Sequence, residues 1–263
     1  MPKFAANLSF LFQELDFLDR FDAAARAGFR GVEYLFPYNH DPAAIETRLK
    51  RNGLTQVLFN AAPGNWAAGE RGLGALPGRE QEFRDAVKLA LDYARALGCE
   101  RIHAMAGIPP AGVPAAELES VFAANLHAAA GLLAPHGIVL LIEPINTRDI
   151  PGYFLTGVEQ ALRIIGQAAA PNLFLQLDLY HRQIMGGDLA ETVRTAFPLT
   201  RHYQIAGVPG RHEPDVGEIN YPYLFDLIDK LGYDGWIGCE YRPKGRTVDG
   251  LGWAGPWGIR TAV

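Results

Sequence analysis

The sequence predicts an α/β protein, built as a single (β/α)8 barrel domain over residues 1–263. Strand-like and helix-like segments alternate eight times, and no shift in composition divides the chain. In addition, four successive strand-like segments end in a side chain with a carboxylate or amide oxygen. A closed barrel brings these strand ends together, whereas an open doubly wound sheet, the alternative architecture, spreads them along a line.

Eight short apolar runs are the expected strands. They have the Val, Ile, Leu and aromatic content of strands that are buried on both faces of a parallel sheet. The run 139–143 shows the pattern most clearly, because Val-Leu-Leu-Ile leads directly into Glu143 and Pro144 then ends the strand. In chain order the expected strands are 4–10, 31–36, 54–60, 101–106, 139–143, 173–178, 202–205 and 236–240.

The intervening helices are expected from apolar residues at helical spacing and from residues that begin or end helices. Asp41 and Pro42 form an N-cap with a first-turn proline, and Thr156 and Glu159 stand in the relation of a capping box. A short helix is expected around 189–197. Asn220 with Pro222 begins another helix, and the other boundaries are marked by Gly28, Gly53, Gly98, Pro135, Gly137 and Gly232.

Two segments depart from regular alternation. The aromatic, glycine-rich tail 244–263 takes the place of a regular last helix. The segment 61–78 is long for a loop in a compact domain and contains Trp66 and Arg71. Loops of this length are often lids, so we expect this loop to order over a substrate.

Charge and composition narrow the function class. The net charge of −5 offers no basic surface for nucleic acid or an anionic membrane, and no apolar run has the length of a membrane span. The apolar start of the chain has no basic leader beyond Lys3, so we expect a strand there and no signal peptide. Cys99 and Cys239 are expected to be reduced, buried thiols. A cytoplasmic enzyme is the expected class, and the number of subunits stays open, a homo-oligomer included.

The four oxygen-bearing strand ends are Glu143, Asp178, Gln204 and Glu240. A buried carboxylate is costly unless a cation, a metal or a proton compensates it. Any one of these residues alone could be a satisfied polar group at a strand–loop junction, but four on consecutive strands predict one metal site. Three acids and an amide oxygen form a hard donor set, which favours Mg2+ or Mn2+, with Mn2+ slightly preferred, over a structural zinc.

Four further residues are candidates for the same site. His181 follows Asp178 by three positions, and Arg211 lies in the Gly/Pro-rich loop after the seventh strand. Arg211 is the cation expected to grip a substrate carboxylate, since guanidinium can do so with two parallel hydrogen bonds. His103 lies inside the fourth strand and is either a substrate contact or a packed core histidine. Glu33, at the end of the second strand, either supports the ligands or lies on the rim.

The motifs around these residues are similar to those of a known family. They are GVEYLFPY at 31–38, LIEPIN at 141–146, DLYH at 178–181, QIAGVPGR at 204–211 and GLGW at 250–253. Together they resemble the hydroxypyruvate isomerase family, within the xylose-isomerase-like barrels that include ketose 3-epimerases. The resemblance spans nearly the whole chain.

The resemblance implies roles for the candidate residues. It implies that Glu143, Asp178, Gln204 and Glu240 bind the metal, that Glu143 and Glu240 are also the acid–base pair, and that His181 and Arg211 contact the substrate. Gln204 stands where sugar epimerases usually have a histidine, which favours the isomerase branch. The implied reaction interconverts hydroxypyruvate and tartronate semialdehyde through an enediolate, in which a divalent ion stabilises the developing charge.

Other functions remain open at this point. A 2-oxo-tetronate isomerase or a ketose 3-epimerase would use the same scaffold. A DNA-repair endonuclease on this barrel would need histidine-rich metal positions and a basic groove, which the sequence lacks. A ligand-binding protein without catalysis would not need two carboxylates beside the metal.

Overall fold

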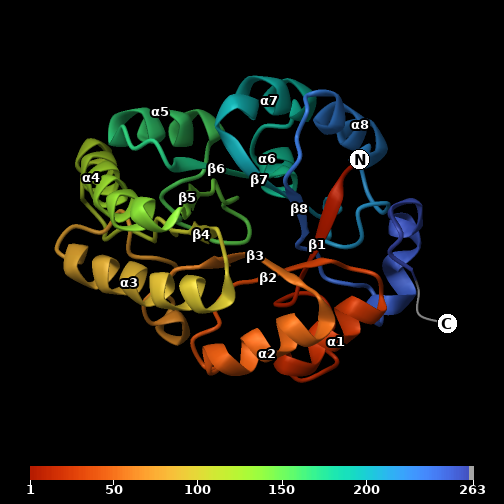
Figure 1. Cartoon of the computed structure of the whole chain (residues 1–263). Coiled ribbons are helices and arrows are strands. Elements are labelled where there is room, and N and C mark those ends of the chain that lie inside the picture. The colour runs from red at the N-terminus through yellow and green to blue at the C-terminus, as the bar shows by residue number, and fades with distance from the viewer. Residues whose placement is uncertain (261–263) are drawn as a thin grey trace.

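The computed structural model describes residues 1–260 and shows eight parallel strands closed into a barrel with helices around the outside (Figure 1). Each strand pairs with the next in chain order, and β1 pairs with β8 to close the barrel. The predicted (β/α)8 barrel is therefore confirmed and the open sheet is excluded. The strands are β1 Lys3–Asn7, β2 Gly31–Tyr34, β3 Thr55–Asn60, β4 Arg101–His103, β5 Val139–Ile142, β6 Leu173–Asp178, β7 Thr200–Ile205 and β8 Trp236–Cys239.

Several strands end earlier than the apolar runs predict, because the chain turns into loops at the carboxyl end of the barrel. β1 ends at Asn7, whose carbonyl oxygen accepts the backbone N–H groups of residues 10 and 11. β4 ends at His103. Beyond it, Met105 and Ala106 accept backbone hydrogen bonds from Gly74 (3.2 Å) and Ala75 (2.8 Å) in the 61–78 loop. These apolar residues thus hold a loop in place instead of extending the sheet.

The helices follow the predicted alternation with one addition and one correction. The short helix α6 begins directly after β6, where Asp178 accepts a hydrogen bond from the backbone N–H of Tyr180 (2.8 Å). The predicted capping box is wrong: the N-cap of α5 is Gly157, and Gln160, not Glu159, bonds the Thr156 N–H. The α-helices are α1 Phe17–Arg26, α2 Pro42–Asn52, α3 Glu80–Leu97, α4 Ala115–Leu133, α5 Val158–Ala168, α6 Leu179–Met185, α7 Leu189–Ala196 and α8 Tyr221–Lys230; the 3-10 helices are η1 Trp66–Ala68, η2 Ala134–His136, η3 Phe197–Leu199 and η4 Thr247–Trp257.

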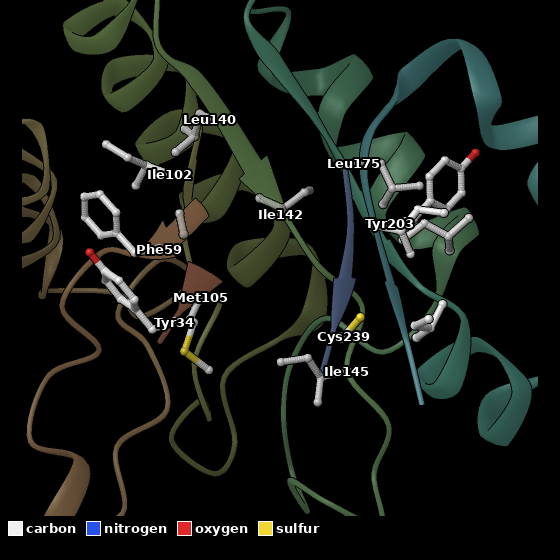
Figure 2. Close-up of a cluster of buried hydrophobic side chains, with 14 of the residues drawn as sticks. Tyr34, Phe59, Ile102, Met105, Leu140, Ile142, Ile145, Leu175, Tyr203 and Cys239 are labelled. Carbon is white, nitrogen blue, oxygen red and sulfur yellow. The ribbon is translucent and has the colours of Figure 1, made fainter. Parts of the chain in front are cut away.

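Apolar side chains between the barrel and the helices form the main core. Figure 2 shows part of this core, with Tyr34, Phe59, Ile102, Leu175 and Cys239 contributed by five different strands. As predicted, both cysteines are free and buried. A smaller cluster fills the opposite side of the sheet, inside the amino-terminal part of the barrel: Ala5, Val57, Leu58 and Leu141.

The C-terminal tail closes the helical layer between α8 and α1 (Figure 1). Phe4 of β1 makes edge-to-face contacts with Phe225 of α8 and with Trp253 and Trp257 of η4, at ring-centroid distances of 5.1, 5.1 and 5.2 Å. The tail therefore lies where a regular helix after β8 would pack in a (β/α)8 barrel. Its last positions, 261–263, lie outside the described residues.

The carboxyl half of the barrel interior is polar. Side chains on a strand alternate between the two faces, so Gln176 with Asp178 and His202 with Gln204 share the inner face in pairs. Glycine at 238 in β8 leaves the room that the Glu33 carboxylate occupies, since a Cβ there would collide with both of its oxygens. Within residues 1–260, no helix combines the length and the apolar composition that crossing a bilayer requires.

Candidate active site

A cavity of about 200 Å³ lies at the carboxyl ends of the strands. That volume corresponds to roughly seven water molecules at about 30 Å³ each, and it is below the range of about 300–1,000 Å³ typical of drug-sized ligands. The cavity therefore suits a substrate of only a few carbon atoms. Its walls contain five of the predicted site residues: His103, Glu143, His181, Arg211 and Glu240.

Three carboxylates lie at this cavity: Glu143 and Glu240 line it, and Asp178 lies beside Glu143 and Arg211. Glu143 follows β5, Asp178 ends β6 and Glu240 follows β8, and their residues are only 5%, 1% and 6% exposed. Within residues 1–260, the Oε1 atom of Glu143 and the Oδ2 atom of Asp178 have no hydrogen-bond partner. One ligand atom each from Glu143, Asp178 and His181 lie within 4.8 Å of one another. Buried oxygens without donors are what a bound cation requires.

The pKa values of these acids also indicate a site that binds a cation. Burial raises the pKa of Glu143 well above its ordinary value, and the nearby Glu240 and Asp178 raise it further. Burial likewise raises the pKa of Asp178 to about 6 and that of Glu240 to about 8, although Arg211 opposes both shifts. The cluster thus holds protons near neutral pH, and a divalent ion would replace them.

Gln204 lies beside Glu240, inside a buried hydrogen-bond network. Its amide nitrogen donates to Glu33 Oε1 (2.8 Å) and to Glu240 Oε2 (2.6 Å), while its amide oxygen accepts from Gln176 Nε2 (2.6 Å). Asn7 Nδ2 also donates to Glu33 and Glu240, at 3.0 Å each. The amide oxygen of Gln204 therefore uses one of its two lone pairs for Gln176, and the other lone pair is the one that a metal ion would use.

Glu33 is fully buried and does not lie on the rim. Besides Gln204 and Asn7, its carboxylate meets His202 Nε2 at 2.7 Å. Of the two alternatives that the sequence left open for Glu33, the structure supports the one in which it holds the residues next to Glu240.

His181 is oriented as a hydrogen-bond donor toward the acids. The Asn146 side-chain oxygen accepts the backbone N–H groups of Arg148 (2.9 Å) and Asp149 (2.8 Å), which turns the amide nitrogen toward His181 Nδ1 (2.6 Å). Since Nδ1 accepts, the proton of the neutral ring lies on Nε2. That atom is 3.5 Å from Asp178 Oδ2 and 3.8 Å from Glu143 Oε1. Burial lowers the pKa of His181 well below its ordinary value, so the ring is neutral.

Arg211 lies at the centre of the acidic cluster and is only 7% exposed. Its guanidinium contacts Asp149 Oδ2 at 2.9 Å, forms an ion pair with Glu240 Oε1, and approaches Asp178 Oδ2 to 3.8 Å. Burial by itself lowers the pKa of Arg211, but Glu240 and the other acids outweigh it and raise the pKa. This guanidinium is therefore largely occupied by the protein's own carboxylates.

His103 lies in the wall of the cavity. Its Nδ1 atom faces Asn60 Oδ1 at 3.2 Å and Glu143 Oε2 at 3.8 Å, and its Nε2 atom has no partner within residues 1–260. Burial lowers the pKa of His103 to about 3, with His202 contributing, so the ring is neutral. The structure thus places this histidine where it can contact a substrate.

The 61–78 loop has two parts. In the second part Gly72 bridges to Ala106 and Leu73 is buried, so the chain there is fixed against the strand ends. In the first part the turn 64–70 is mostly exposed and contains Trp66, which packs on Phe36 at 5.1 Å. This outer turn is held to its surroundings by side chains, since Glu70 also pairs with Arg79 at 2.7 Å.

Several residues of the site are absent from the sequence prediction. The inner-face positions Gln176 and His202 could have been found, since each stands two residues before a predicted ligand and strands have a period of two. Asn7 and Asn60 are the last residues of β1 and β3, and an amide side chain at a strand end does not indicate a particular function. Arg242 follows Glu240 by two positions and lines the same cavity.

The comparisons with known proteins agree with this geometry. The family model for the xylose isomerase-like TIM barrel matches residues 21–256. The chain belongs to this family. A 2-oxo-tetronate isomerase of Cupriavidus necator is 57% identical over 98% of this chain and 99% of its own, and the hydroxypyruvate isomerase of Escherichia coli is 49% identical over 98% of this chain and 100% of its own. The predicted resemblance to hydroxypyruvate isomerases is confirmed, and the protein is an isomerase.

A solved structure has the same fold along nearly the whole chain. The crystal structure of a Brucella melitensis protein, named AP endonuclease, family 2, is 54% identical and superposes with a TM-score of 0.96 over 98% of this chain and 99% of that one. A 3-keto-D-glucoside 4-epimerase from E. coli, 18% identical with a TM-score of 0.81 over 97% of this chain and 99% of its own, shares the fold alone.

Proposed function

We propose that the protein interconverts hydroxypyruvate and tartronate semialdehyde by moving a proton between neighbouring carbons, with 2-oxo-tetronates as the alternative substrates. The observation that supports this most is the pair of buried carboxylates, Glu143 and Glu240, in one small cavity. Proton transfer between adjacent carbons needs one base and one acid of the protein beside the substrate. The cavity therefore has to hold little more than the substrate itself.

The site suits a divalent ion, Mg2+ or Mn2+. Glu143, Asp178 and Glu240 would hold it together with the amide oxygen of Gln204, and the partnerless oxygens of Glu143 and Asp178 support this assignment. His181 is not assigned as a ligand, because its Nε2 atom carries the proton. When bound, the ion would stabilise the negative charge that develops on the substrate oxygens.

The side chains of this chain have the following roles in the proposal. One of Glu143 and Glu240 removes a proton from C3 of hydroxypyruvate, and the other protonates C2 of the enediolate, while the proton of the C3 hydroxyl passes to the C2 oxygen. A carboxylate that binds a divalent ion is a weak base, so stabilisation of the enediolate has to supply much of the acceleration. His181 donates its Nε2 proton in a hydrogen bond to a substrate oxygen, Arg211 contacts a second substrate oxygen beside Glu240, and His103 Nε2 faces the substrate from the wall.

An endonuclease is the alternative from another class, and the name of the Brucella melitensis relative supports it. Its substrate would have to bind across the cavity as a polyanion. The protein has a net charge of −5, and the cavity is small and acid-lined. These properties favour the isomerase over a protein that binds the phosphate backbone.

The buried free thiols fit a reducing compartment, and we place the protein in the cytoplasm.

One panel of assays tests this proposal. Enzyme freed of metal by chelation is assayed with hydroxypyruvate, a 2-oxo-tetronate, a ketose and abasic-site DNA, before and after addition of Mg2+ or Mn2+. We expect the oxo acids to be turned over only when the ion is present. Full activity in verified metal-free enzyme would contradict the metal, and cleavage of DNA without oxo-acid turnover would contradict the isomerase.

A further inference from the structure

Two arginines in the cavity wall have no role in the proposed proton transfer. Arg71, in the 61–78 loop, and Arg242, after β8, both line the cavity. Neither has a carboxylate within 4.0 Å among residues 1–260, whereas Arg211 has three, those of Asp149, Asp178 and Glu240. A cation in a cavity wall without an anionic partner points to an anion brought by the ligand.

The charge balance of the site favours such cations. Glu143, Asp149 and Glu240 line the cavity, and two further buried carboxylates, Asp178 and Glu33, lie beside them. These five carboxylates face Arg211 and a divalent ion, which leaves two negative charges, so a substrate carboxylate would be repelled. Arg71 and Arg242 supply two positive charges, which offset them.

Arg71 is the better positioned of the two. Its Nη1 atom donates to the carbonyl oxygens of Trp66 (3.0 Å) and Glu70 (2.7 Å), and its guanidinium lies over the Trp66 ring at 3.9 Å. Its main chain leads into Gly72, which is fixed by the bridge to Ala106 and by a hydrogen bond to the carbonyl of residue 63 (2.9 Å). The guanidinium is thus oriented in advance, which reduces the entropy lost when it binds an anion.

The contacts of Arg71 leave one edge of its guanidinium available. Only Nη1 has partners among residues 1–260, so Nε and Nη2 keep their N–H groups for a ligand. This edge has the fork geometry that binds a carboxylate through two parallel hydrogen bonds. Arg242, which is exposed, has no such fixed orientation.

We propose that Arg71 binds the carboxylate of the substrate, with Arg242 as the assisting cation, and thereby selects oxo acids over neutral ketoses. This inference rests on the proposed function, which supplies the acidic substrate. It assigns to Arg71 the role that the sequence suggested for Arg211, whose guanidinium stays with Glu240 and Asp149. Arg71 is a specificity residue and takes no part in the proton transfer.

Binding of an inert ligand tests this assignment without turnover. D-Glycerate keeps the carboxylate of hydroxypyruvate, and D-glyceramide replaces it with a neutral amide of the same shape. Both are titrated into Mg2+-loaded wild type, Arg71→Met, Arg242→Met and the control Arg84→Met, which removes an exposed arginine of α3. Loss of a charge-assisted hydrogen bond corresponds to roughly a ten- to hundredfold change in affinity.

We expect Arg71→Met to weaken glycerate binding by that factor, Arg242→Met to weaken it less, and Arg84→Met to leave it unchanged. Glyceramide binding should change less than about threefold in every variant, which also shows that the variants are folded. Equal losses for the two ligands in Arg71→Met, or no preference of the wild type for glycerate, would overturn the inference. If glycerate binding behaves as expected but hydroxypyruvate is not turned over, the inference holds and the proposed function fails.

Discussion

The acid cluster should make the metal-free protein less stable as the pH rises from about 5 to 8. The folded-state pKa of Asp178 is about 6 and that of Glu240 about 8, both above the ordinary values of 3.8 and 4.5 that apply to the unfolded chain. In this pH window the folded state therefore holds protons that the unfolded chain has already released. Stability then decreases with increasing pH, because it increases only where the unfolded state binds more protons.

The size of the effect follows from the number of protons retained. Each proton that the folded state retains lowers the free energy of unfolding by about 1.4 kcal/mol per pH unit. A single proton retained over three pH units therefore gives a loss of about 4 kcal/mol. For a chain of this size, 1 kcal/mol shifts Tm by roughly 2–4 °C, which gives a decrease of about 8–16 °C. Mg2+ should abolish the decrease, since it stabilises the ionised acids.

Thermal unfolding in chelator at about pH 5, 6, 7 and 8, at one scan rate, measures this slope. Glu240→Gln, which removes one titrating acid at nearly constant shape, is the control and should flatten the slope. A metal-free Tm that stays constant or increases over this range would show that the folded acids retain no extra protons. An unchanged slope in Glu240→Gln would show that Glu240 retains none.

Three further predictions concern the surroundings of the site. In 15N NMR, His181 should carry its proton on Nε2, and Asn146→Ala should weaken this preference, since only the backbone N–H of residue 146 then donates to Nδ1 (3.4 Å); an Nδ1–H ring in the wild type would refute the assigned orientation. Gly72→Ala should lower Tm more than Gly69→Ala, because its Cβ would lie 2.5 Å from Met105 whereas the surroundings of Gly69 are open; equal decreases would contradict the fixed loop segment. Glycerate should slow proteolysis in the turn 64–70, and unchanged cleavage would argue against its ordering over a ligand.

The sequence predicted the barrel and the residues at its strand ends because both follow from simple periodicities. The run before Glu143 is apolar throughout, as a strand buried on both faces must be, and the barrel then fixes where its end lies. The helix α6 escaped prediction because its seven residues are too few for a helical apolar pattern to be distinguished.

The sequence did not predict in which direction the side chains of the site point or which groups they contact. The position of Gln204 was predicted, but the orientation of its amide depends on Glu33 and Gln176, which are 171 and 28 residues away along the chain. Arg211 was predicted to grip a substrate carboxylate, but Asp149, 62 residues away, occupies part of its guanidinium. Such choices depend on contacts between distant segments, and local patterns contain no information about them.

We propose that Glu143 and Glu240 move a proton between C3 and C2 of an oxo acid. NMR in D2O with Mg2+-loaded enzyme follows the C3 hydrogens of hydroxypyruvate and so observes this transfer. We expect the wild type to form tartronate semialdehyde and to exchange the C3 hydrogens for deuterium. Glu143→Gln and Glu240→Gln, with metal bound and the fold intact, should each be slower by roughly 10²–10⁴-fold. Exchange at the wild-type rate in either variant, or neither product nor exchange in the wild type, would contradict the account.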